Sequence, residues 1–337
     1  MNTTDDPIIE QRYSMKTSEI VEVILLGIIC VIGTIGNLLV VAAVITTRSL
    51  QVRQNAFIVV LATTDLVTSA ILTPFFMLCL VRGGWPFKEI ACVFLGNVTI
   101  LSLTTSGLTV NGIAVCRYVT VAYTNPVRRK LIHGRVVITA SASLIVIALG
   151  AVLLPVFGFG DVGFNPKLGH CSLKYDTQLE WYYSAMMFLI GLLFTLTVVP
   201  ISYSLIFWIV RKSRISIENM TLASRTGQSS DKSTNSKDTS PKIIRPRRNM
   251  SRDELRLSKK LLLLFGLFLF CWIPYTSVIL ADKNGTVPKE AHRPTNFLLW
   301  MNACLNPFLY AWMIPAYRQA YKRLLSDLFC QNKYHCL

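Results

Sequence analysis

The feature that most constrains this chain is a series of seven apolar stretches, each about 20 or more residues long, separated by polar segments. A helix of about 20 residues rises about 30 Å and crosses the hydrocarbon layer of a bilayer. Mean hydropathy of +0.48, with 52% hydrophobic and 15% charged residues, also suits lipid as the solvent. We therefore predict an all-α membrane protein, a seven-transmembrane helix bundle. Its spans are residues 20–47, 56–81, 91–121, 134–157, 182–210, 256–281 and 294–314.

Basic residues are distributed unevenly between the two ends of the predicted bundle. If residues 1–19 lie outside, 24 of the 34 Lys and Arg residues fall in cytoplasmic segments and 9 in outer segments. Cytoplasmic loops of membrane proteins carry such an excess of Lys and Arg. The formal charge of +16 therefore reflects orientation and does not indicate nucleic-acid binding. We expect a multi-pass plasma-membrane protein with an extracellular N-terminus and a first helix that serves as its insertion signal.

Two of the nine cysteines differ from the rest by their position. Cys92 stands at the outer start of the third span and Cys171 in the second outer loop, and both face an oxidising compartment in this topology. A disulfide between them would tie the loop to the third helix, and two unpaired thiols are the alternative. On the same side, Asn2 is a predicted glycosylation acceptor. On the opposite side, Cys330 is a predicted palmitoylation site.

Two cytoplasmic segments have distinctive compositions. Residues 213–253 are rich in Ser, Thr, Lys, Arg and Pro, so we expect a disordered third loop within the bundle region 20–314. Its hydroxyls are candidate phosphorylation sites. In residues 315–329, apolar and basic side chains alternate at helical spacing, which predicts a short amphipathic eighth helix on the membrane surface. Residues 330–337 complete the cytoplasmic tail.

Asp65 is an ionisable residue in the middle of the second predicted span. A charge at that depth costs about 2.5–3.5 kcal/mol unless polar groups solvate it. Ser106, Asn302 and Asn306 stand at comparable depth in other spans. The four side chains could form a wet cavity that holds a small cation, or a hydrogen-bonded knot without an ion.

A second polar feature lies at the inner ends of the third and sixth spans. Arg117, beside Tyr118, stands at the end of the third span, and Glu254 stands at the start of the sixth. An ion pair between Arg117 and Glu254 would hold the cytoplasmic face shut, and breaking it would open a cleft for a partner. Two snorkelling surface charges are the alternative.

The chain now resembles the rhodopsin-like class of G-protein-coupled receptors over roughly residues 20–330. The resemblance rests on short motifs that occur in the family's order. They are GN (Gly36, Asn37), LATTD (Leu61 to Asp65), Cys92, CRY (Cys116 to Tyr118), Pro200, FLFCWIPY (Phe268 to Tyr275) and NPFLY (Asn306 to Tyr310). Within the class, NGIAVCRYVTVAYTNP and VGFNPKLGHC look most similar to melatonin receptors and to orphan relatives such as the moody, trapped-in-endoderm and medium-chain fatty-acid receptors.

The resemblance implies a ligand pocket among the outer halves of the helices and a sodium ion held by Asp65, Ser106, Asn302 and Asn306. It implies a switch for a heterotrimeric G protein, of the inhibitory class as a first expectation, with arrestin and receptor kinases as further partners. The switch residues are Arg117, Tyr118, Glu254 and Tyr310. Two departures matter. Cys116 replaces the usual acid before Arg117, which predicts raised basal signalling, and Trp208 replaces a usual tyrosine.

The expected pocket is mostly apolar with a few neutral hydrogen-bonding groups, which suits a lipid-like or indole-like ligand. Lys167, His170 and Lys174 of the outer loop are candidates for capturing an acidic head group. Thr99 stands where amine receptors of the class carry an aspartate, so a biogenic amine is disfavoured. The full predicted ligand set is Thr99, Lys167, His170, Leu192, Leu196, Trp272, Tyr275, Thr276, Ile279, Asn296 and Trp300.

Other functions are less compatible with the sequence. A peptide-activated or constitutively active receptor of the same fold is the nearest alternative. A transporter or channel is a different class, but the two halves show no repeat and no matched pair of broken spans. An enzyme is not expected, because Asp65 has no acidic neighbour at depth and the four histidines lie in loops, at span margins or in the tail.

Overall fold

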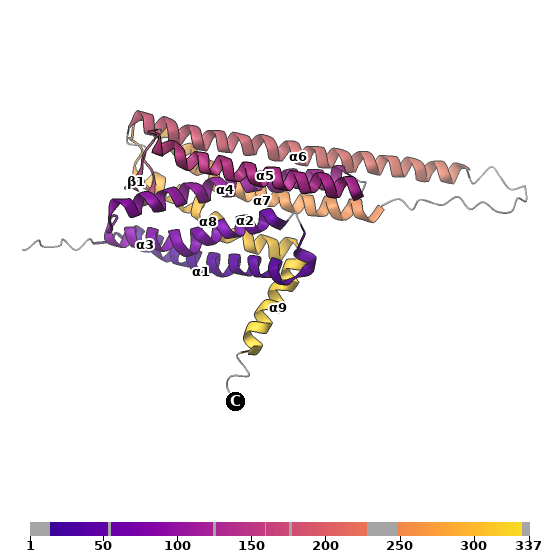
Figure 1. Ribbon diagram of the computed structural model, residues 1–337, viewed down its shortest axis with the longest axis horizontal. Coiled ribbons are helices and arrows are strands. Elements are labelled where there is room, and N and C mark those ends of the chain that lie inside the picture. The colour runs from indigo at the N-terminus through magenta and orange to yellow at the C-terminus, as the bar shows by residue number, and fades with distance from the viewer. Residues whose placement is uncertain are drawn as a thin grey trace, which may run out of the picture.

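The computed structural model describes residues 14–52, 55–123, 126–158, 160–174, 177–227 and 248–331. Long helices lie side by side in a bundle, with a hairpin at one end and a helix turned away from the bundle at the other (Figure 1). All seven apolar stretches are helical, which confirms the predicted fold class. The helices of the bundle are α1 (Thr17–Thr46), α2 (Asn55–Val67), η2 (Thr68–Leu72), α3 (Thr73–Arg82), α4 (Glu89–Ala122), α5 (Pro126–Val156), α6 (Gln178–Gly227), α7 (Arg248–Ala281) and α8 (Lys289–Met313), with η1 (Arg48–Leu50) in the first loop.

The second span is a single rod made of α2, η2 and α3. The N–H of Thr73 bonds to the carbonyl of Thr68, five residues back, which makes η2 a π-turn. Pro74 follows at the start of α3 and has no N–H to donate, so the regular ladder cannot continue through it. This turn changes the rotation of α3 relative to α2 just beyond Asp65.

Six helices in the described residues are long and apolar enough to cross a membrane alone. The seventh, α8, reaches that standard only together with α9 (Pro315–Gln331), from which it is bent by 106°. α8 is less apolar because it buries Asn296, Asn302 and Asn306 against the other helices. Its polar face is directed into the bundle and supplies several of the site residues below.

α4 runs through the middle of the bundle and packs against α2, α5, α6 and α7. α1 packs closely against α8. A Cβ on Gly36 would lie 2.9 Å from Pro307, so only glycine allows this close approach. Next to it, Asn37 donates hydrogen bonds to the carbonyls of Gly33 and Ala303, each 2.9 Å long. The GN and NP motifs therefore hold α1 and α8 together.

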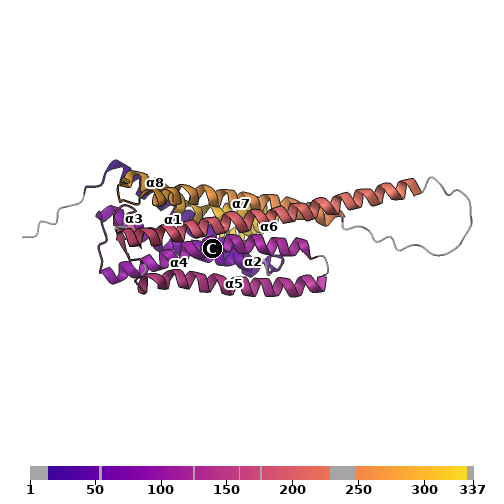
Figure 2. The ribbon, with the colours of Figure 1, turned by 90° about the horizontal axis from the view of Figure 1, so that it is seen from above.

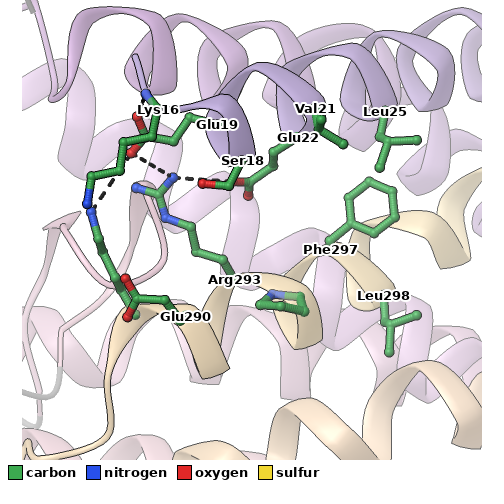
Figure 3. Close-up of a pocket in the computed structure, with 12 residues that line it drawn as sticks. Lys16, Ser18, Glu19, Val21, Glu22, Leu25, Glu290, Arg293, Phe297 and Leu298 are labelled. Carbon is green, nitrogen blue, oxygen red and sulfur yellow. Dashed lines mark hydrogen bonds and ion pairs between the residues drawn. The ribbon is translucent and has the colours of Figure 1, made fainter. Parts of the chain in front are cut away.

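The same two helices also meet at their first turns. Arg293 of α8 forms ion pairs with Glu19 and Glu22 of α1 at 3.5 and 3.2 Å (Figure 3). At the opposite end, α9 turns away from α8 and packs Tyr317 and Ala320 against the core, while Leu328 stays 69% exposed. α9 is the predicted amphipathic helix of residues 315–329.

The hairpin consists of β1 (Val162–Asn165) and β2 (His170–Leu173), which pair antiparallel. The register places Val162 opposite Leu173 and Asn165 opposite His170. The connecting turn ends at Gly169, whose φ of +80° is the left-handed conformation that glycine adopts without strain.

The predicted disorder of residues 213–253 is wrong at both margins. α6 continues to Gly227 and α7 begins at Arg248, and Figure 2 shows α6 running beyond the end of the bundle. A helix nucleated inside the bundle extends at low cost, because each added residue gains one backbone hydrogen bond. Residues 228–247 lie outside the described residues, as do Asn2 and the side chain of Cys330.

Candidate functional site

The hairpin fills the outer end of the bundle. β2 is buried along its whole length and packs against α3 and α4. The disulfide between Cys92 and Cys171 joins β2 to the start of α4, with the two Cα atoms 5.4 Å apart. This confirms the predicted crosslink. The loop is therefore an internal part of the outer end and leaves little room above the helices.

His170 lies at the centre of a buried cluster beneath the hairpin. Its ring is 5.0 Å from the ring of Phe76 and 5.2 Å from that of Trp300. The indole of Trp300 donates to Asn296 Oδ1 at 3.2 Å, and Thr99 lines the same cluster. The structure thus brings Thr99, His170, Asn296 and Trp300 together as predicted. The cavity left among them measures about 10 Å³, which is no larger than one water requires.

Burial lowers the pKa of His170 to about 4, although its contacts with a backbone carbonyl and with Asn296 oppose the shift. The ring is therefore neutral at pH 7 and carries one proton. Both ring nitrogens face oxygen atoms, Nδ1 the Cys171 carbonyl at 3.0 Å and Nε2 the Asn296 Oδ1 at 3.4 Å. One proton can satisfy only one of these contacts.

The structure gives other partners to Lys167, His170 and Lys174, the side chains predicted to capture an acidic head group. His170 is uncharged. Lys174 pairs with Asp161 at 2.7 Å, a contact that raises the lysine's pKa. Lys167 is paired with Asp282. Each of the two lysines finds a carboxylate within the outer loops.

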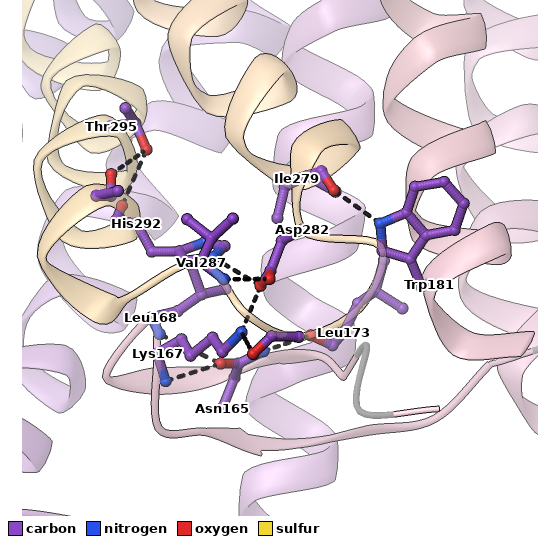
Figure 4. Close-up of polar contacts among 12 residues, drawn as sticks. Asn165, Lys167, Leu168, Leu173, Trp181, Ile279, Asp282, Val287, His292 and Thr295 are labelled. Carbon is purple, nitrogen blue, oxygen red and sulfur yellow. Dashed lines mark hydrogen bonds and ion pairs between the residues drawn. The ribbon is translucent and has the colours of Figure 1, made fainter. Parts of the chain in front are cut away.

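Asp282 joins the hairpin loop to the loop between α7 and α8 (Figure 4). It is fully buried and accepts hydrogen bonds from Lys167, from His292 Nε2 at 2.9 Å and from the N–H of Val287 at 2.8 Å. Lys167 also donates to the carbonyl of Gly285 at 2.9 Å. Burial alone raises the pKa of Asp282, but these hydrogen bonds outweigh it and hold the pKa below its usual value. We call Lys167, Asp282 and His292 the outer latch.

A second cavity, of about 290 Å³, lies between α4, α5 and α6 beneath β2. Its inner end is closed by Phe268 and Trp272, whose rings stack 5.0 Å apart. Ile147, Ile190 and Phe194 line the cavity and are also 46–57% exposed on the outside of the bundle. The cavity therefore opens sideways, between α5 and α6, at the surface that faces lipid. We call it the lateral cavity.

The lateral cavity contains polar groups that sequence reasoning missed. Asn111 donates to Thr195 Oγ1 at 2.9 Å, which links α4 to α6 across the cavity. In the part of the chain that the structure describes, Asn111 Oδ1 and Trp272 Nε1 are buried without a hydrogen-bond partner. The signal was present, because Thr104, Leu108 and Asn111 form one row along the helix of the third span.

Two predicted ligand residues of α6, Leu192 and Leu196, do not line this cavity. Leu196 is 36% exposed, and neither it nor Leu192 is among the lining side chains, whereas Phe188, Gly191 and Thr195 are. The difference is one of helical register. Steps of four residues from Pro200 rotate by about 40° each away from a fixed face, because a turn holds 3.6 residues.

The predicted α7 residues divide into two groups. Trp272 lines the lateral cavity, as expected. Tyr275, Thr276 and Ile279 are buried behind it, each at most 2% exposed. Tyr275 reaches the cavity through Phe188, whose ring lies 5.1 Å away. Tyr275 and Ile279 pack in the same buried core as Trp272, and Thr276 is buried beside them.

The side chains predicted to hold a cation have the chemistry that a small hard cation requires. Asp65 is 3% exposed and accepts a hydrogen bond of 2.7 Å from Asn306. Ser106 Oγ is buried with no hydrogen-bond partner among the described residues, and Asn302 is 8% exposed. One carboxylate with hydroxyl and amide oxygens is a donor set for a monovalent ion. Within the described ranges, no group of three His, Cys, Asp or Glu side chains offers a transition-metal site.

The inner end of the bundle carries the predicted switch residues. Arg117 lies close enough to Tyr203 and Tyr317 to interact electrostatically with both. Tyr310 is fully buried and its ring lies 5.6 Å from that of Tyr317. Tyr118 packs against the core. The side chain of Glu254 lies outside the described residues, so its pairing with Arg117 stays a prediction.

A contact that the sequence did not indicate joins α7 to the end of α8. Lys260 donates from Nζ to the carbonyl of Met313 at 2.9 Å. Met313 is the last residue of α8, where carbonyls lack partners within the helix and a cation is favoured. Lys260 thus connects the inner ends of two helices that must separate if α7 swings outward.

The sequence of residues 36–310 matches the family described as "7 transmembrane receptor (rhodopsin family)". The chain belongs to this family. It is a G-protein-coupled receptor, a signalling receptor of the membrane and not an enzyme.

Named relatives agree with this assignment. The receptor is 26% identical to the G-protein coupled receptor moody of Drosophila melanogaster over 90% of this chain and 50% of that protein. It is also 26% identical to the mouse melatonin receptor type 1B, over 90% of this chain and 76% of that protein. The chain spans about half the length of the moody receptors it matches. Both groups were predicted from the motifs.

Squid rhodopsin has the same fold. The two structures superpose with a TM-score of 0.74 at 21% identity, over 97% of this chain and 92% of the rhodopsin chain. This likeness supports the seven-helix arrangement, in which α8 is the seventh span and α9 the helix that follows it.

Proposed function

We propose that this receptor responds to a lipid-like small molecule that enters the lateral cavity from the bilayer and activates a heterotrimeric G protein at the inner end. The observation that carries the proposal is the sideways opening between α5 and α6, which leads to the stacked Phe268 and Trp272. The space beneath the hairpin is too small for a ligand. The outer latch also closes the route for a hydrophilic ligand or a large peptide.

The polar groups of the cavity determine which lipid-like molecules suit it. Asn111 Oδ1 offers an acceptor and Trp272 Nε1 a donor, and a buried polar atom without a partner is unfavourable. A ligand hydroxyl or amide near these atoms would pair them once the side chains adjust. Uncharged or weakly polar amphiphiles therefore fit better than a free cation. The cavity of about 290 Å³ limits the ligand to a small molecule or a single chain.

An indole-like ligand is the second candidate. Phe188, Phe194, Phe268 and Trp272 give the cavity aromatic walls that would stack on a flat ring system. The relatives include melatonin receptors, whose name specifies an indole-containing ligand.

Filling the cavity tests the proposal. Gly191 lines the lateral cavity and a Cβ there would meet no atom within 4 Å, so Gly191→Leu adds bulk at the cavity without a clash at its Cβ. Gly266→Leu is the matched control, since Gly266 also has open space around it but lies outside the cavity. G-protein sensors for each subtype are read with monoacyl lipids, fatty amides and indoleamines. The proposal requires that Gly191→Leu abolish the response and Gly266→Leu keep it. A response equal in both variants contradicts it.

Signal output depends on Arg117 and its neighbours. We propose the inhibitory G-protein class as partner, with arrestin and receptor kinases acting on the same inner face. Cys116 supplies no carboxylate to pair with Arg117, which supports raised basal signalling. Cys116→Asp should lower ligand-free nucleotide exchange on added G protein, and unchanged exchange would show that the missing acid has no effect.

We propose that a sodium ion is held by Asp65, Ser106, Asn302 and Asn306 and stabilises the resting state. The orphaned hydroxyl of Ser106 and the single carboxylate support this role. Sodium should raise the melting temperature of the receptor relative to equal concentrations of N-methyl-D-glucamine, and Ser106→Ala should reduce that increment. Equal melting temperatures in both salts would contradict it.

The proposed orientation places the N-terminus and the hairpin outside the cell. The Cys92–Cys171 disulfide supports this, because disulfides persist in oxidising compartments. Glycosylation at Asn2 and palmitoylation at Cys330 follow from the same orientation. Labelling of an N-terminal tag on intact cells tests it.

A further inference from the structure

A groove of about 530 Å³ runs along the surface between α1 and α8 and shares no lining residue with the lateral cavity or the outer latch (Figure 3). It begins at Lys16 and Lys289, in front of the first turns of the two helices, and ends at Leu25 and Leu298. Nine residues of helix rise about 14 Å. That length is close to half of a hydrocarbon layer about 30 Å thick, so the groove spans one leaflet.

The two ends of the groove differ in chemistry. The end at the helix starts is lined by Lys16, Glu19, Glu22, Lys289, Glu290 and Arg293. The other end is lined by apolar side chains, of which Val21 and Leu25 are 50% and 39% exposed. Figure 3 shows Phe297 and Leu25 side by side at this end, beyond Arg293. A charged end followed by an apolar channel matches a lipid head group followed by an acyl chain.

The charged end has unused hydrogen-bonding capacity. Arg293 lies 3.2 Å from Glu22 and 3.5 Å from Glu19, and Lys289 lies 3.8 Å from Glu19. These distances exceed the 2.7–2.9 Å of a strong charge-assisted hydrogen bond. Among the residues that the structure describes, Glu22 Oε1 and Arg293 Nε are buried without any hydrogen-bond partner. The cluster therefore lacks both a donor and an acceptor.

The signs of the charges select the head group. Three carboxylates face three basic groups at this end, so neither a purely anionic nor a purely cationic head is favoured. A zwitterion brings an ammonium for the Glu22 side and a phosphate for the Arg293 side. A primary ammonium donates hydrogen bonds to a carboxylate, whereas a quaternary ammonium donates none and is recognised by cages of aromatic rings. Phe297 is the single aromatic ring among the lining residues.

We propose that the groove between α1 and α8 binds a phosphatidylethanolamine-type phospholipid, with its ammonium at Glu22, its phosphate at Arg293 and Lys289, and one acyl chain along Leu25 and Phe297. Small rotations of the Glu22 and Arg293 side chains bring their unpaired atoms to the head group. The site is separate from the ligand cavity and does not depend on which molecule activates the receptor.

Lipid competition on the full-length receptor tests the proposal. Receptor in nanodiscs of equal phosphatidylethanolamine, phosphatidylcholine and phosphatidylglycerol with identical acyl chains is released for native mass spectrometry, and the retained lipids are counted. Wild type should retain the ethanolamine lipid about tenfold over each of the others, the ratio expected when charge-assisted hydrogen bonds are gained by one head group alone. Equal retention, or preference for the choline or glycerol lipid, overturns the proposal.

Variants locate the lipid. Leu25→Trp blocks the apolar end of the groove, and Ile28→Trp places the same ring on an equally accessible position of α1 outside it. Leu25→Trp should lose the retained lipid and Ile28→Trp should keep it. Glu22→Gln should keep a lipid but lose the preference for ethanolamine over choline. Melting curves confirm folding, and if either tryptophan variant unfolds, Glu22→Gln decides, because an unchanged head-group preference there overturns the assignment.

Discussion

The outer and inner ends of this receptor are fastened in different ways. At the outer end, a disulfide joins β2 to α4, and the buried Asp282 gathers contacts from two loops. At the inner end, the described contacts between helices include the hydrogen bond from Lys260 to the carbonyl of Met313, and Arg117 lies near Tyr203 and Tyr317. Covalent and buried ionic bonds cost several times more to break than one partly buried hydrogen bond.

The difference indicates where shape change is inexpensive. The outer end is a rigid frame for the cavities, whereas no disulfide joins the inner helix ends among the residues that the structure describes. A conformational change that begins at Trp272 therefore leaves the outer end in place and moves the inner ends of the helices. Breaking contacts at each end should have opposite consequences. Outer variants should lose stability, and inner variants should gain basal activity.

The largest effect is expected from removing the disulfide. Cys171→Ser opens a link between residues 79 apart in sequence, and closing a loop of that size is worth about 4 kcal/mol in the chain-entropy account. We expect loss of most correctly folded receptor from the cell surface, measured by surface labelling and thermal unfolding. Cys30→Ser removes a free thiol and should behave as wild type. Equal surface levels for the two variants would show that the outer frame does not need its covalent bond.

Asp282→Asn should have the next largest effect. It leaves Lys167 without its buried carboxylate partner, and breaking such a pair costs about 3 kcal/mol. The control is Asp161→Asn, because the Asp161–Lys174 pair is exposed and worth at most about 1 kcal/mol. Unfolding of detergent-solubilised receptor measures both. If Asp282→Asn and Asp161→Asn have the same melting temperature, the outer latch contributes no more stability than a surface ion pair.

Acidification should weaken the outer end through His170. Its pKa is about 4 in the folded protein and 6.5 when exposed, so the unfolded state binds more protons between these values. The stability contribution is complete above pH 6.5 and is lost as pH falls, by about 2 kcal/mol at pH 5. His170→Gln should flatten the melting-temperature profile between pH 7 and 5. Burial also lowers the pKa of His292, so the outer latch adds to the loss as pH falls below 6.5. Asp282 contributes only at lower pH, because its pKa lies below its usual value.

The smallest stability effect, with the opposite functional sign, is expected at the inner end. Lys260→Met keeps the aliphatic chain and removes the hydrogen bond to Met313, which is worth about 1 kcal/mol. Basal nucleotide exchange should rise roughly fivefold with little change in melting temperature, since that free energy converts to such a ratio. Lys322→Met, on α9, is the control for loss of positive charge. If Lys260→Met instead lowers stability strongly without raising basal exchange, the inner end is as rigid as the outer end.

Most of the fold follows directly from the sequence. Spans in lipid must satisfy their backbone hydrogen bonds internally, so length and hydropathy alone identify helices. Cys92 and Cys171 were predictable from topology, because among the nine cysteines only these two stand at the outer start of a span or in an outer loop, which face an oxidising compartment. The extension of α6 to Gly227 was not predictable from composition, since a helix already formed upstream lowers the cost of adding polar residues.

The site was less predictable, for physical reasons. Thr99, His170, Asn296 and Trp300 were identified correctly as neighbours. They pack together where the hairpin enters the bundle, and they leave no open pocket between them. How deeply a loop packs depends on contacts between residues far apart in sequence, such as Lys167 with Asp282. The choice of Leu192 and Leu196 in place of Gly191 and Thr195 arose because a small rotation of a helix changes which side chains face inward.

The long continuation of α6 has a mechanical consequence. Pro200 interrupts the backbone ladder within the helix, and 27 residues of unbroken helix, about 40 Å, follow it to Gly227. A change of bend at Pro200 therefore moves the whole segment from Pro200 to Gly227 as one rigid helix. A tilt of about 10° at that point moves the far tip by about 7 Å, so adjustments too small to disturb the cavity walls become large excursions at the end of the arm.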